Sequence, residues 1–221
     1  MNIENNILKH YLKNCYFING TAYAGKSTMC RMLAEKYDMI HCEENYNMDI
    51  ILSVATQENQ PNINYFNTKI DWKKFVSRTP DEYESWINGN TREITGFEIV
   101  ELIRLSATKK VIVDTNIPCD VLKEISDYNR VAIMLSPQSM SVDKFFDRDD
   151  PEKQFLLSEI QKCSDPEKTL QNFKECIARI NSQKYYEDFK NSGFFTLVRE
   201  NIETDTKAQT LTALANHFGL E

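Results

Sequence analysis

Histidine and cysteine are few and dispersed in this sequence of 221 residues. The three histidines give a His-rich metal site little support, because they are spread along the chain as His10, His41 and His217. The cysteines contain no C-x-x-C pair and occupy Cys15, Cys30, Cys42, Cys119, Cys163 and Cys176. Several fall in or beside apolar, strand-like runs. We therefore expect reduced, buried thiols, with a metal or disulfide role as the alternative.

Long apolar runs are also missing. No stretch approaches the roughly eighteen apolar residues that a membrane-spanning helix needs. The opening residues 1–6 lack the basic and apolar regions of a signal peptide. We therefore expect a cytoplasmic protein with no membrane contact.

Basic clusters are short in this acidic chain. The net charge is −7 and the sequence pI is about 5.2. The densest basic runs are Lys73-Lys74 and Lys109-Lys110, which we interpret as solvated positions beside structural elements. A nucleic-acid surface would require a concentrated basic patch, so we expect no nucleic-acid partner.

The remaining composition is typical of a globular protein. Hydrophobic residues make up 41% of the chain and charged residues 27%. A chain of this length fits a single domain over residues 1–221 better than two independent domains.

Buried strands alternate with helical patterns along most of the chain, which predicts an α/β fold. The expected strands are Cys15–Ile18, Met39–Cys42, Lys110–Val113, Val131–Leu135 and Phe194–Val198. The expected helices are Lys26–Tyr37, Ile94–Leu105, Cys119–Tyr128, Pro166–Lys190 and Lys207–Phe218. We expect a five-stranded, mainly parallel sheet with helices on both faces.

Residues 44–89 depart from this alternation, since they are polar and rich in asparagine. We interpret the interval as a helical insertion. Its aromatic residues Trp72, Phe75, Tyr83 and Trp86 have spacings that suit short helices, and they are explained by a small satellite core.

One motif carries chemistry. The segment Gly20–Ser27 matches G-x-x-x-x-G-K-[ST] between a buried strand and a helix. Glycines let successive backbone N–H groups face phosphate oxygens, and the helix adds the positive end of its dipole. The expected nucleotide-binding residues are Gly20, Thr21, Ala22, Tyr23, Ala24, Gly25, Lys26, Ser27 and Thr28. Lys26 should reach the β and γ phosphates, and the Ser27 hydroxyl should bind Mg²⁺.

Motifs of other P-loop classes are missing from the sequence. There is no Asn-Lys-x-Asp guanine motif, no Leu-Ser-Gly-Gly signature and no apolar strand ending in Asp-Glu. A hydrolytic switch or motor is therefore less favoured.

The chain resembles the P-loop small-molecule kinases, a group that includes nucleoside monophosphate, shikimate and gluconate kinases and the zeta-toxin-like enzymes. The similarity spans nearly the whole chain. It rests on the early loop, on Glu43-Glu44 after the second strand, on a third strand that ends in Asp114, on an Arg-containing lid over residues 137–153, and on residues 198–205, placed like the loop beside the base.

The resemblance implies a P-loop NTPase three-layer sandwich that uses ATP and Mg²⁺ to phosphorylate a small-molecule acceptor. Residues 114–118 read Asp-Thr-Asn-Ile-Pro, where adenylate kinases carry Asp-Gly-x-Pro-Arg, and the glycines of shikimate kinases are missing. The identity of the acceptor is therefore not carried over.

Asp114 follows a buried strand at the carboxyl edge of the sheet, where α/β proteins gather ligands. We predict that it holds a Mg²⁺-bound water; the alternative is a cap for the following helix. Glu43 or Glu44 is a candidate to accept the acceptor's proton or to hydrogen-bond the acceptor, unless both belong to a solvated acidic turn.

In the lid that the resemblance implies, Arg148 is the candidate to stabilise charge on the transferring phosphoryl group. The alternative is a surface ion-pair cluster with the neighbouring aspartates. By the same resemblance, the insertion should bind the acceptor with help from Arg78, Arg92 or Arg104, although Arg104 is also explained as a favourable charge at a helix C-terminus.

The leading hypothesis is a kinase that acts on a small-molecule acceptor. The alternatives are a nucleotide-binding regulatory protein and a slow NTPase. The sequence specifies neither the acceptor, the preferred base nor the oligomeric state.

Overall fold

The computed structural model has an α/β fold built on a five-stranded sheet and describes residues 3–146, 151–200 and 204–221. The strands are β1 (Cys15–Gly20), β2 (Ile40–Cys42), β3 (Val111–Asp114), β4 (Val131–Leu135) and β5 (Phe195–Val198). Every pairing between them is parallel, in the order β2-β3-β1-β4-β5. The predicted α/β class and five-stranded sheet are confirmed.

The central strand, β1, sets the edge at which the loops gather. All its residues are buried, as expected for a strand covered on both faces. Its Ile18 lies opposite Asp114 of β3, and its Gly20 lies opposite Met134 of β4. Because the strands are parallel, the loops that leave β1, β3 and β4 emerge side by side at one edge.

Helices of very different lengths connect the strands. They are α1 (Asn5–Tyr11), α2 (Lys26–Tyr37), α3 (Met48–Val54), α4 (Trp72–Val76), α5 (Pro80–Leu105), α6 (Cys119–Ile125), α7 (Gln138–Asp143), α8 (Pro151–Gln161), α9 (Pro166–Ile180), α10 (Gln183–Lys190) and α11 (Lys207–Phe218). Two short 3-10 helices, η1 (Asn64–Asn67) and η2 (Tyr128–Arg130), complete the set within the described ranges.

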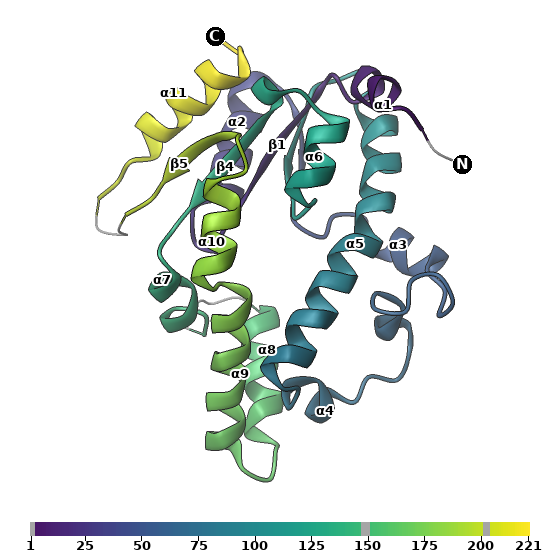
Figure 1. Cartoon of the computed structure of the whole chain (residues 1–221), viewed down its shortest axis with the longest axis vertical. Helices are drawn as coiled ribbons and strands as arrows, with labels where there is room; N and C mark the ends of the chain where they lie inside the picture. The colour runs from purple at the N-terminus through teal and green to yellow at the C-terminus, as the bar shows by residue number, and fades with distance from the viewer. Residues whose placement is uncertain (1–2, 147–150, 201–203) are drawn as a thin grey trace.

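Helices cover both faces of the sheet (Figure 1). On one face, α2 and α11 pack through Leu33 and Leu214 against Tyr16 and Ile18 of β1. On the other face, α1, α5 and α6 pack against the alternate residues of the same strand, including Phe17. The alternation of side chains along a strand therefore divides the core into two apolar layers.

The helix predicted over Ile94–Leu105 begins much earlier, at Pro80. The cause is local: Thr79 and Glu82 form a reciprocal capping box, and Pro80 occupies the first turn, where it fits best. The added turns carry the helix away from the sheet.

The helix predicted over Pro166–Lys190 is divided in two. Asn181 ends α9, and Ser182 adopts an extended conformation before α10 begins. The helix predicted over Cys119–Tyr128 also stops early, because Ser126 is extended. Serine favours such boundary positions because its side chain competes with the helical backbone for hydrogen bonds.

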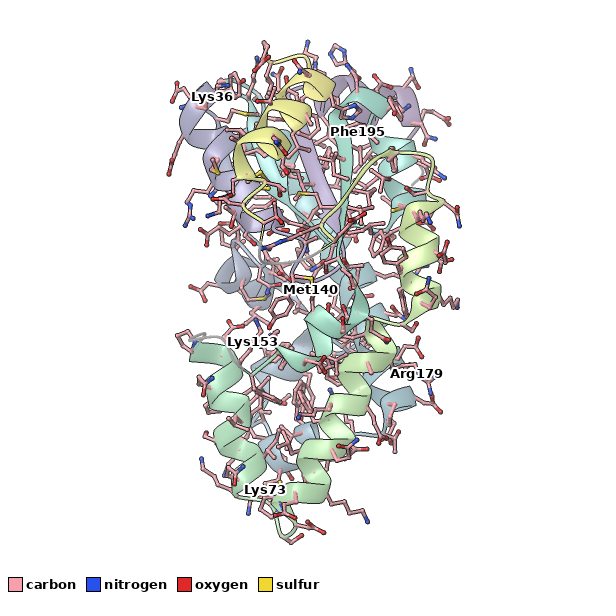
Figure 2. The ribbon with its side chains drawn as sticks, turned by 90° about the vertical axis from the view of Figure 1, so that its left-hand side faces the viewer. Lys36, Lys73, Met140, Lys153, Arg179 and Phe195 are labelled. Carbon is pink, nitrogen blue, oxygen red and sulfur yellow. The ribbon has the colours of Figure 1, made fainter. Side chains whose placement is uncertain are left out.

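A second, smaller core lies beyond the sheet, among α4, α8, α9 and the first turns of α5; we call this region the helical lobe (Figure 1). Figure 2 shows Lys73 at its far end, Phe195 at the sheet end and Met140 of α7 between them.

The satellite core predicted for the aromatic residues of the insertion is confirmed in the helical lobe. Phe75 and Tyr83 are buried there, and Trp72 and Trp86 pack against them. Phe173 of α9 completes this core, with its ring centroid 5.5 Å from that of Tyr83. The lobe is therefore assembled from two separated stretches of the chain.

In the described ranges, no helix is both long enough and apolar enough to cross a membrane.

Candidate functional site

The loop between β1 and α2 turns directly against β4. Gly20 has a φ of +130°, and a Cβ atom added there would lie 1.9 Å from the carbonyl oxygen of Met134. Only glycine fits this close approach.

Hydrogen bonds fasten the first half of the loop to the end of β4. The Thr21 amide donates to the Met134 carbonyl over 3.0 Å. The Ser136 amide donates to Thr21 Oγ1 over 2.7 Å, and Ser136 Oγ donates to the Ala22 carbonyl over 2.6 Å. The loop is thus held in place by groups outside the motif.

The second half of the loop leads into the N-terminus of α2. Gly25 has a φ of +94° and occupies the N-cap position, and the first turn of α2 contains no acidic residue. Tyr23 is also left-handed, with a φ of +65°, and its hydroxyl donates to the Lys144 carbonyl. The end of a helix of this length is attractive to an anion, because its first N–H groups have no partners within the helix.

Three side chains meet across the ends of β1 and β3. Ser27 Oγ donates to Asp114 Oδ2 over 2.5 Å. Lys26 Nζ lies 3.9 Å from Asp114 Oδ1 and 3.3 Å from the Thr21 carbonyl, to which it donates. The structure therefore brings together three residues that the sequence predicted for phosphate and Mg²⁺ binding.

Asp114 is a buried carboxylate with one oxygen that is free to accept a hydrogen bond. Its side chain is 1% exposed, and Oδ1 has no hydrogen-bond partner among the described residues. Burial raises the pKa of this carboxyl, while the positive charge of Lys26 and the hydrogen bond from Ser27 lower it. The negative charge of Glu44 raises the pKa further. The alternative role as a helix cap is wrong, because α6 begins at Cys119 with Pro118 at its N-cap position.

These groups fit a Mg²⁺ ion that keeps much of its water. Over residues 3–146, 151–200 and 204–221, no three His, Cys, Asp or Glu side chains gather as ligands. Mg²⁺ commonly binds one or two protein oxygens together with waters and phosphates. Because Ser27 donates its hydrogen to Asp114, lone pairs of the serine oxygen are left for a cation. Asp114 Oδ1 could accept a hydrogen bond from a metal-bound water.

The two glutamates after β2 differ in their surroundings. Glu44 Oε1 accepts a hydrogen bond of 2.8 Å from Asn116 Nδ2, in the loop that follows β3. The side chain of Glu43 is 77% exposed, and its carboxylate lies 3.9 Å from His41 Nδ1. Glu44 is thus joined to the loop beside Asp114, whereas Glu43 faces solvent.

The three described arginines that were predicted to assist the acceptor have different surroundings. Arg148 lies outside the described residues. Arg78 stacks among three rings of the helical lobe, including that of Phe75, from which its guanidinium carbon is 4.6 Å away. Arg104 contacts Glu101 on its own helix, near the C-terminus of α5. Arg92 is exposed on the same helix.

Glu98 of α5 is a site residue that sequence reasoning missed. Its side chain is buried, and Thr115 Oγ1 donates to it over 3.3 Å. Burial raises its pKa to about 7, and the charges of Glu44 and Asp114 act in the same direction. The sequence feature that could have revealed it is the four-residue spacing of Glu98 and Leu102, which places a carboxylate on the apolar face of a helix.

A cavity of about 320 Å³ adjoins the second half of the loop. Gly25, Thr28 and Met29 line one side of it, and Leu197 and Asp205 line the other. The chain after β5 is tied to the loop here, because Arg199 Nη1 donates to the Tyr23 carbonyl over 3.3 Å. Of the segment 198–205 that was predicted to lie beside the base, the described residues Val198, Arg199, Thr204 and Asp205 line this cavity.

Comparisons with known proteins leave this geometry as the main guide to function. No protein-family model matches the chain, and no curated protein matches it in sequence.

Proposed function

We propose that the chain is an ATP- and Mg²⁺-dependent phosphotransferase with a P-loop NTPase fold, which transfers the γ-phosphoryl group to a small-molecule acceptor. The observation that carries the proposal is the meeting of Lys26 and Ser27 with the buried Asp114. A glycine-rich turn, a cation, a hydroxyl and a carboxylate at one helix N-terminus are the groups that binding of MgATP requires.

Each part of the site has a role in this proposal. Backbone N–H groups of residues 20–28 and the Lys26 ammonium bind the phosphates, while Ser27 and Asp114 hold the hydrated Mg²⁺. When bound, Mg²⁺ neutralises developing charge on the phosphate oxygens. The 320 Å³ cavity receives the nucleoside. Arg148 remains the proposed lid cation.

Glu44 is the favoured candidate to accept the proton of the acceptor. Its carboxylate is hydrogen-bonded to the loop after β3, and its charge raises the pKa of Asp114. Glu43 is the weaker candidate because it faces solvent. A proton acceptor must lie within hydrogen-bond reach of the acceptor hydroxyl, directly or through one water.

The test is release of ADP from MgATP, alone and with pooled nucleosides, nucleotides, sugars and hydroxy acids. One pool should stimulate release. Asp114→Asn should lower this rate about 10- to 100-fold while nucleotide is still bound, because the loss of a group that positions a metal has this typical cost. Asp120→Asn, an exposed change on α6, is the matched control.

Two results would contradict the proposal. Tight nucleotide binding without stimulation by any pool would favour a nucleotide-binding regulatory protein. Rapid loss of ATP that no pool accelerates would favour a stand-alone NTPase.

A further inference from the structure

A second cavity, of about 300 Å³, adjoins the first half of the loop. Its wall includes Thr21, Ser136 at the end of β4, Gln138 of α7 and Tyr186 of α10. Apart from Pro137, all the described residues that line it carry uncharged polar side chains. The 320 Å³ cavity differs, because Arg199, Asp205 and Lys207 line it.

The nitrogen atom of each amide side chain in the second cavity makes one hydrogen bond within the protein. Gln138 Nε2 donates to the Ala178 carbonyl over 2.8 Å, and Asn181 Nδ2 donates to the Ile177 carbonyl over 2.9 Å. Gln183 Nε2 donates to Glu187 Oε1, also over 2.8 Å. Each of these three amides therefore keeps its oxygen as a hydrogen-bond acceptor and its second N–H as a donor.

The lining hydroxyls differ in whether they have partners. Ser136 Oγ and Ser141 Oγ donate to the Ala22 carbonyl, and Thr21 Oγ1 is hydrogen-bonded to Ser136. Tyr186 is the exception. Its hydroxyl has no hydrogen-bond partner among the described residues. The cavity therefore offers uncharged acceptors and donors, and these suit a ligand rich in hydroxyl groups, which both donate and accept hydrogen bonds. A phosphate or carboxylate would meet amide oxygens without a compensating cation, which is unfavourable.

The position of the cavity relates it to the triphosphate. Lys26 Nζ donates to the carbonyl of Thr21, and Thr21 also lines the cavity. The lysine of such a loop reaches the β and γ phosphates. A nucleotide whose base occupies the 320 Å³ cavity, beside Gly25 and Thr28, would thus extend its γ-phosphate toward Thr21.

We propose that the 300 Å³ cavity binds the phosphoryl acceptor, and that this acceptor is an uncharged compound with several hydroxyl groups. This inference rests on the proposed function. One acceptor oxygen bonds to the γ-phosphorus as the bond from that phosphorus to the bridging oxygen of ADP breaks. The hydroxyl proton passes to water, because no carboxylate is among the described residues that line the cavity. The site draws on residues 136–141, rather than on the segment 44–89 predicted to bind the acceptor.

The experiment compares matched probes that differ only by a phosphate: myo-inositol with its 1-phosphate, D-ribose with its 5-phosphate, and glycerol with its 3-phosphate. Binding of MgATP is measured first by calorimetry, and ADP release is then measured with each probe. We expect stimulation by at least one uncharged member and by no phosphorylated member.

The matched variants are Tyr186→Phe and Tyr185→Phe, at neighbouring positions on α10. The Tyr185 hydroxyl donates to Glu84 in the helical lobe and does not line the cavity. Tyr186→Phe should raise KM for the stimulating probe about fivefold, with kcat and KM for ATP unchanged, because one neutral hydrogen bond is lost. Tyr185→Phe should leave all three values unchanged.

The outcomes separate the two proposals. A protein that does not bind MgATP would contradict the proposed function itself. If MgATP binds, the cavity assignment is refuted by stimulation from any phosphorylated probe, by the absence of stimulation from all three uncharged probes, or by equal KM values in the two variants.

Discussion

Replacing Gly20 with alanine should disrupt the loop on which the site depends. The new methyl carbon would lie 1.9 Å from the Met134 carbonyl oxygen, with backbone atoms of β4 also within 3.0 Å. The φ of +130° adds strain for any residue with a side chain. Backbone strain and overpacking each cost about 1–3 kcal/mol, so we expect a loss of about 3 kcal/mol in the free energy of unfolding.

Two assays measure this loss. In a domain of this size, 1 kcal/mol corresponds to about 2–4 °C in Tm, so Gly20→Ala should lower Tm by about 6–12 °C. Calorimetry should also show weaker binding of MgATP, because the displaced loop no longer presents its N–H groups together.

The matched control is Gly96→Ala on α5. A Cβ at Gly96 would meet no atom within 4 Å, and alanine is the better helix former. The free energy of unfolding of this variant should rise by up to about 1 kcal/mol, and its nucleotide affinity should be unchanged. The reasoning is refuted if Gly20→Ala matches the wild type in both Tm and nucleotide binding.

Further predictions concern the helix start, the buried glutamate and the loop lysine. Thr79→Ala should lower the free energy of unfolding by about 1 kcal/mol in urea denaturation, because α5 loses its capping box; an undiminished value would contradict the cap. The pKa of Glu98, raised to about 7, favours the protonated folded state, so its contribution to stability falls as pH rises from about 4.5 to 7. The free energy of unfolding of Glu98→Gln should therefore exceed that of the wild type by roughly 3 kcal/mol at pH 8 and equal it at pH 4.5. Equal free energies of unfolding at pH 8 would refute this reasoning. Lys26→Ala should weaken MgATP binding about 100-fold, whereas Lys36→Ala, on the exposed face of α2, should leave it unchanged.

Local patterns in the sequence were sufficient to predict the sheet and the loop after β1. β1 is a continuous apolar run followed by a glycine motif, and both signals lie within a few residues. Ser27 and Asp114 are far apart in sequence, yet their meeting was predictable, because parallel strands end at the same edge of a sheet.

One local signal was overlooked, and contacts between distant segments were not predicted. The capping box of Thr79 and Glu82 signalled the true start of α5, but the polar residues after it hid the helical pattern. The packing of Phe173 against Tyr83 joins two segments that no local pattern relates. The contact of Glu98 with Thr115 likewise required knowing which face of α5 covers the sheet.

The most direct test of the account is calorimetric titration of the protein with a non-hydrolysable ATP analogue, with and without Mg²⁺. The account predicts one bound nucleotide per chain, tighter binding with Mg²⁺, and loss of that Mg²⁺ effect in Ser27→Ala. Absence of binding, or a Mg²⁺ effect that survives in Ser27→Ala, would contradict the claim that the loop after β1 binds MgATP.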